Sequence, residues 1–177
     1  MLEGSSVVQS LSPRVLIIGL GNEVRGDDAA GLVAARQLKR EFAERVEVLE
    51  SGGDGAQLMQ AWKDACSVIV VDAAASGAPP GTVHRFDARA EALPAGRFGG
   101  STHAFGLAEA IELARALDEL PQRLVIYAIE GKAFETGAAL SPEAQAAVES
   151  LAARVRADVE SMYAPSRCAE LSCMNTR

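Results

Sequence analysis

Short runs of aliphatic and β-branched residues alternate along the chain with longer stretches whose apolar positions recur at helical spacing. The runs at 14–20, 46–50, 67–72, 81–86 and 124–129 predict strands, the fourth of them a short edge strand. Helices are predicted through Leu32, Ala35, Leu38 and Phe42, and over 56–62, 106–117 and 141–163. Such alternation is typical of crossover units. We therefore expect an α/β fold, a three-layer α/β/α sandwich with a mostly parallel, about five-stranded central sheet.

The length of 177 residues suits one domain, which the pattern assigns to residues 14–163. Residues 1–13 are interpreted as a flexible leader and residues 164–177 as a disordered tail. The net charge of −7 argues against a nucleic-acid partner, and no apolar run approaches the ~20 residues of a membrane span. Because the N-terminus also lacks the features of a secretory signal, we expect a cytoplasmic protein.

The three cysteines give no sign of a disulfide framework or a zinc site. Cys66 lies beside a predicted strand, whereas Cys168 and Cys173 lie in the polar tail without a second pair of ligands nearby. This usage agrees with a reducing compartment, and we assign these thiols no function.

Three potential metal ligands, Asp28, Asp72 and His103, each follow an apolar run. Because the carboxyl ends of parallel strands share one edge of a sheet, the three side chains are expected to converge there. Two carboxylates and one imidazole can hold a divalent transition ion and leave positions open for substrate or water. Simpler interpretations stay open for each residue: helix capping by Asp27 and Asp28, turn formation by Asp72, and a solvated imidazole.

The loop after the first strand also permits a dinucleotide-binding interpretation that uses Gly19, Gly21 and Glu50. Against it, Val24 occupies the place of the third glycine, and two carboxylates stand where a phosphate would meet the helix N-terminus. A Rossmann-like module therefore remains an alternative. The other histidine, His84, falls inside the predicted edge strand and is interpreted as an exposed strand residue outside the site.

Several ordered segments resemble the [NiFe]-hydrogenase maturation endopeptidases. They are the loop GLGNEVRGDDAAG at 19–31, LESGG at 49–53, VVDA at 70–73, PGTV at 80–83, STHAFGL at 101–107, and the late strand and helix start at 129–130 and 140–143. The resemblance covers about residues 14–163. Glu50 stands where the family usually has aspartate, and the tail after Tyr163 has no counterpart.

The resemblance implies the phosphorylase/hydrolase-like form of the α/β sandwich and an endopeptidase, a hydrolase of hydrogenase maturation. Its substrate would be the nickel-loaded precursor of a [NiFe]-hydrogenase large subunit, from which it removes the C-terminal extension. Asp28, Asp72 and His103 carry over as the nickel-binding and catalytic residues, with Glu50 as an auxiliary. The nickel would come with the precursor, and zinc or cadmium could replace it in a crystal. We expect a monomer.

The residues themselves add one negative observation, which bears on the mechanism. No Ser-His-Asp spacing and no activated cysteine is recognisable, so a covalent mechanism lacks a nucleophile. Metal-assisted or water-based hydrolysis is the remaining route. A non-enzymatic nickel-site chaperone, which would hold the precursor through the same residues without cutting it, is the second alternative.

Overall fold

The computed structural model describes residues 14–42, 45–93 and 106–163, which contain a five-stranded sheet. Its strands are β1 (Val15–Leu20), β2 (Glu47–Ser51), β3 (Ser67–Ala74), β4 (Val83–Asp87) and β5 (Arg123–Glu130). They lie in the order β2-β1-β3-β5-β4, and only β4 is antiparallel to its neighbour. The predicted mostly parallel sheet is therefore confirmed.

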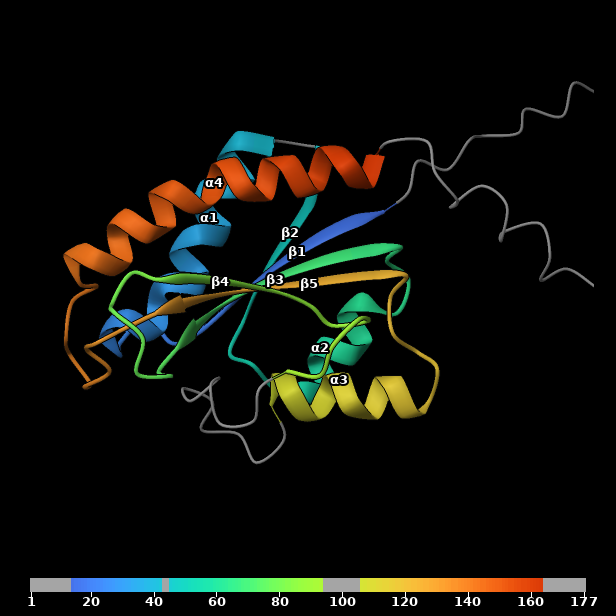
Figure 1. Cartoon of the computed structure of the whole chain (residues 1–177), viewed down its shortest axis with the longest axis horizontal. Helices are drawn as coiled ribbons and strands as arrows, with labels where there is room; N and C mark the ends of the chain where they lie inside the picture. Colours follow the sequence, from blue (N-terminus) through green and yellow to red (C-terminus); the bar gives the residue numbers. More distant parts are fainter. Residues whose placement is uncertain (1–13, 43–44, 94–105, 164–177) are drawn as a thin grey trace, which may run out of the picture.

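Helices cover both faces of the sheet, which confirms the three layers (Figure 1). One face packs against α1 (Ala30–Phe42) and α4 (Pro142–Tyr163), and the other against α2 (Gly55–Trp62) and α3 (Leu107–Ala116). The three central strands are buried on both sides, as their almost continuous apolar sequences require, while β2 and β4 at the edges are half-exposed.

The strand β3 extends two residues beyond the predicted end at Asp72. Ala73 and Ala74 have weak strand preference by themselves, but both are in register with the last residues of β5, Ile129 and Glu130. Pairing with a neighbouring strand therefore outweighs local preference here, and Asp72 lies inside the strand rather than at its end.

Close contact between α1 and the sheet depends on a glycine near the start of the helix. A Cβ atom on Gly31 would lie 2.2 Å from the carbonyl oxygen of Leu20 and 2.3 Å from that of Val71. Only a residue without a side chain fits there. The helix is thus held against the carboxyl ends of β1 and β3, and so is the loop before it.

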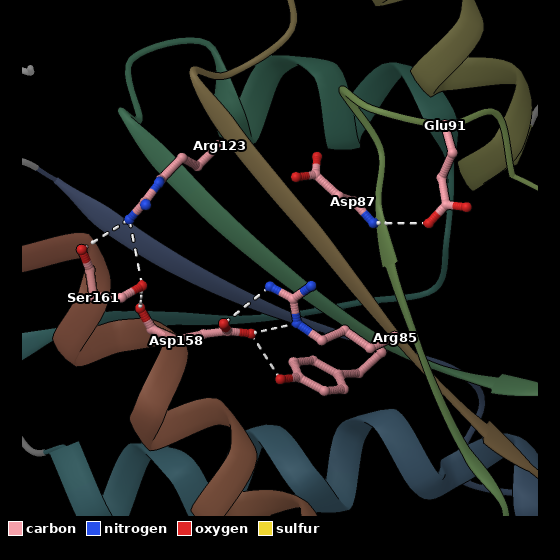
Figure 2. Close-up of polar contacts among 7 residues, drawn as sticks. Arg85, Asp87, Glu91, Arg123, Asp158 and Ser161 are labelled. Carbon is pink, nitrogen blue, oxygen red and sulfur yellow. Dashed lines mark hydrogen bonds and ion pairs between the residues drawn. The ribbon is translucent and has the colours of Figure 1, made fainter.

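The edge strand β4 is fastened to α4 by a polar network, which Figure 2 shows. Arg85 donates two hydrogen bonds of 3.0 Å to the carboxylate of Asp158, which also accepts a bond of 2.7 Å from the hydroxyl of Tyr127. Because Tyr127 packs on the α1/α4 side, Arg85 lies on the face of β4 opposite to that of its neighbour His84.

The start of α4 offers a first test. The hydroxyl oxygen of Ser141 accepts a hydrogen bond of 3.2 Å from the Ala144 N–H and so caps the N-terminus of the helix. Ser141→Ala is expected to lower the free energy of unfolding by about 1–2 kcal/mol in chemical denaturation. Ser150→Ala is the matched control, because the Ser150 hydroxyl bonds only to the Ala147 carbonyl of the same helix. Equal effects of the two substitutions would contradict the capping role.

The leader at 1–13 and the tail at 164–177 lie outside the described residues, so these two assignments stay predictions. Among the residues that the structure describes, no helix combines the length and the apolar character needed to cross a membrane.

Candidate functional site

The loop after β1 forms a short 3-10 helix, η1 (Gly26–Ala29), which the sequence did not predict. Gly26 has a φ of 55°, and a Cβ atom on it would lie 2.3 Å from the carbonyl oxygen of Ala133. The next residue, Asp27, donates its N–H to that same carbonyl at 2.7 Å. The first loop therefore lies directly against the loop that follows β5.

The Asp27 carboxylate fastens these two loops together. Asp27 is fully buried and accepts three backbone N–H bonds, from Lys132 at 2.8 Å, Ala133 at 3.1 Å and Ser141 at 2.6 Å. Burial by itself would raise the pKa of Asp27, but these N–H donors hold it below its usual value. Asp27 is thus a satisfied structural anion, and its carboxylate bonds to the late loop instead of capping α1.

Asp28 differs from its neighbour although it is nearly as buried. It is 4% exposed, and its carboxylate accepts no hydrogen bond from any of the described residues. Burial raises the pKa of Asp28, and the positive charge of Arg25 opposes that rise only in part. A carboxylate that has no hydrogen-bond donor among the described residues is better suited to a cation than to capping.

Asp72 lies on β3 beside η1, among closely packed atoms, although part of its side chain still reaches the surface. Burial raises its pKa to about 7; the Ala73 N–H, which donates at 2.8 Å, lowers it in part, and the charge of Asp28 raises it further. The structure thus brings Asp28 and Asp72 together at the carboxyl edge of the sheet. The charge of Asp28 disfavours a negative charge on Asp72, and a cation between them would remove that cost.

The third expected ligand, His103, lies outside the described residues, as does all of 94–105. Described structure resumes at Gly106, the N-cap residue of α3. Within the described ranges no group of three or more His, Cys, Asp or Glu side chains is arranged to hold a metal ion. The three-residue nickel site therefore stays a prediction, with two of its three members placed side by side.

Glu50, the proposed auxiliary, lies in a separate groove of about 440 Å³ beside the first loop. Its carboxylate accepts bonds from Arg36, which also pairs with Glu23. This hydrogen bonding with Arg36 lowers the pKa of Glu50. A catalytic role for Glu50 stays a prediction, and the acceptor that a ribose hydroxyl would need is already engaged by the arginine.

Two further polar residues of this edge were missed from the sequence. Glu130 ends β5 and is 1% exposed, with its carboxylate bound by the Ser76 hydroxyl at 2.9 Å and the Gly77 N–H at 2.7 Å. The interpretation of His84 as an exposed strand residue is wrong. Its side chain is 23% exposed, and its Nε2 atom is buried 3.7 Å from the Glu130 carboxylate. The available signal was an acid directly after the apolar run 124–129, the same signal that marked Asp72.

Comparison with known proteins gives consistent similarities. A family model described as hydrogenase maturation protease matches residues 32–157, a range that includes Asp72 and His103 and begins beyond Asp28. Over 138 residues the chain is 30% identical to the hydrogenase expression/formation protein HupD of Thiocapsa roseopersicina; the match covers 74% of this chain and 61% of that relative. Identity to the hydrogenase 2 maturation protease of Escherichia coli is 28%, with coverage of 77% and 84%.

The fold has solved counterparts as well. The hydrogenase maturating endopeptidase HybD from E. coli superposes with a TM-score of 0.71 at 25% identity, and the match covers 84% of this chain and 93% of that structure.

Proposed function

The chain belongs to the hydrogenase maturation protease family, and from this premise we propose that it removes the C-terminal extension from the precursor of a [NiFe]-hydrogenase large subunit once nickel has been inserted. The enzyme is then a hydrolase whose substrate brings its own metal. A cytoplasmic location and a monomeric state belong to the same proposal.

The observation that carries the proposal is the pair formed by Asp28 and Asp72. Both carboxyl groups have raised pKa values, and they share the edge of the sheet where α/β folds bind their ligands. Two oxygen donors, joined by an imidazole, would suit a nickel ion that already has ligands of its own in the precursor. His103 is proposed as that imidazole.

In this proposal the protein's residues act by position and charge. Asp28 and Asp72 become fully ionised when the precursor's nickel docks, which fixes the scissile peptide next to them. Nickel bound there would supply Lewis acidity toward a carbonyl or a water molecule. Asp27 keeps the first loop in place without taking part in binding.

The test is mass spectrometry of the large subunit from cells with and without this gene. Cells that lack the gene are expected to retain the C-terminal extension. Complementation with His103→Ala is expected to leave the subunit unprocessed, because two carboxylates alone hold nickel weakly. Complementation with Glu47→Gln should restore processing, since Glu47 pairs with Arg14 at the far end of β2. Wild-type processing by the His103→Ala variant would refute the assignment.

The chaperone alternative predicts the same loss in cells and needs a purified system to be separated. Wild-type protein mixed with nickel-loaded precursor is expected to release the C-terminal peptide, whereas a chaperone would form a complex and release nothing. Native mass spectrometry distinguishes the two outcomes in one sample.

A further inference from the structure

Hydrolysis of a peptide bond requires a proton for the departing amine, and the proposed nickel-binding residues are poorly suited to supply it. Side chains that bind a metal do so in their deprotonated forms. If Asp28, Asp72 and His103 hold the precursor's nickel, a protein side chain that donates the proton would be another group at the same edge of the sheet. This reasoning rests on the proposed function.

Such a group is present on the edge strand β4. His84 is in register with Ala128 of β5, and Ala128 is in register with Asp72 of β3. Residues in register across neighbouring strands point to the same face, so His84 and Asp72 lie on one face with only an alanine between them. Two strand spacings separate their Cα atoms by about 10 Å. We expect a peptide segment held at Asp72 to lie within a short distance of His84.

The surroundings of His84 include a buried carboxylate, that of Glu130. Glu130 is almost completely buried, and the Ser76 hydroxyl and the Gly77 N–H fix its carboxylate in place. A buried carboxylate is costly without a positive partner, and His84 is the basic side chain paired with it in the part of the chain that the structure describes. The Nε2 atom of His84 is buried 3.7 Å from Glu130 Oε2 and has no other partner among the described residues.

The imidazole lies beside Glu130 and is partly accessible at the surface. Its ring lies 6.2 Å from that of Phe86 in a stacked arrangement, and 23% of the side chain stays exposed. An imidazole with one nitrogen near a buried carboxylate and part of the side chain at the surface is an arrangement suited to a histidine that exchanges protons with a substrate.

We propose that His84 is the proton donor of the cleavage reaction and that Glu130 is its positioning residue. Water adds to the scissile carbonyl carbon, the C–N bond breaks, and His84 gives its proton to the departing nitrogen. The proton that the attacking water loses returns the imidazole to its protonated form. No oxidant or reductant takes part.

The test uses purified protein and nickel-loaded precursor, with His84→Ala and His84→Gln as the variants. We expect kcat to fall by about 10²-fold or more with KM nearly unchanged. Wild-type activity should decline at alkaline pH as the imidazolium loses its proton, and this decline should be absent from the variants. Among the described residues, Glu130 on β5 is the charged group beside His84, and Asp72 on β3 lies on the same face of the sheet. Added imidazole should restore part of the activity of His84→Ala, which a purely structural role would not allow.

Two controls complete the experiment. Arg85→Lys changes the neighbouring residue on the opposite face of β4, where it pairs with Asp158 (Figure 2), and should keep wild-type kcat and pH dependence. Glu130→Gln should lower kcat in the wild-type background but not in His84→Gln, because the two residues act as one unit. Wild-type kcat and pH dependence in both His84 variants would overturn the inference alone, whereas no cleavage by wild-type protein would overturn the proposed function as well.

Discussion

The Asp72→Asn variant is expected to be more stable than the wild type at pH 8 and yet unable to process the precursor. Asparagine keeps the shape of the protonated carboxyl group and still accepts the bond from the Ala73 N–H. It removes a negative charge that burial and the neighbouring Asp28 both disfavour. The same charge is what a docked cation requires, so stability and function should change in opposite directions.

The sign and size of this effect follow from the pKa of Asp72. That pKa is raised from 3.8 to about 7 on folding, so the folded state keeps a proton that the unfolded state releases between these values. The resulting stabilisation is complete below about pH 4 and is lost as the pH rises through 7. A shift of about three units corresponds to roughly 4 kcal/mol, and partial exposure reduces this to about 2–4 kcal/mol.

Denaturation of both proteins at pH 4, 6 and 8 measures the difference directly. The two free energies of unfolding should agree at pH 4 and separate progressively, with Asp72→Asn the more stable at pH 8. Glu47→Gln is the control, because Arg14 favours the charged form of Glu47 and its removal gives no gain at high pH. A difference between Asp72→Asn and wild type that is independent of pH would mean that Asp72 is already ionised in the folded protein at low pH.

Asp27→Ala is expected to lower the free energy of unfolding, in contrast to Asp72→Asn. It leaves the N–H groups of Lys132, Ala133 and Ser141 without their acceptor in a buried place. Each unsatisfied buried donor costs about 1–3 kcal/mol, so we expect a loss of about 3–5 kcal/mol once water enters the gap.

Chemical denaturation at neutral pH measures this loss, and Asp54→Ala provides the scale. Asp54 caps α2 through one exposed bond of 3.0 Å to the Gln57 N–H, and its removal should cost only about 1 kcal/mol. If both aspartates gave similar losses, the two loops would not depend on Asp27.

Much of the fold could be predicted from the apolar pattern, because the apolar positions in the sequence are the positions that are buried in the structure. The runs that became β1, β3 and β5 are apolar at nearly every position, as strands covered on both faces must be. The extension of β3 to Ala74 was missed because it depends on pairing with β5, which the local sequence does not encode. The helix η1 was missed because it depends on contacts with the loop after β5.

The placement of Asp28 and Asp72 at one edge of the sheet was predictable from the sequence, but the different surroundings of Asp27 and Asp28 were not. Asp27 and Asp28 are adjacent and chemically identical, and contacts with residues more than a hundred positions away distinguish the carboxylate that accepts three backbone bonds from its neighbour. The role of Glu130 was hidden for a similar reason, since its partners Ser76 and His84 lie about fifty residues away in the sequence. Whether His103 joins Asp28 and Asp72 stays a prediction.

The hydrogen bonds of Asp27 also determine how much of the chain must be synthesised before the first loop, which carries Asp28, can be fixed in place. Asp28 is synthesised early, but the loop that carries it is fixed by N–H groups that extend to Ser141. Contacts this far apart in sequence form late in folding because a long loop has to close first. A ribosome-bound fragment that ends before this residue would contain Asp28, Asp72 and His103 and still lack the fixed first loop. We therefore expect the protein to bind its proposed precursor substrate only after nearly the whole domain has left the ribosome.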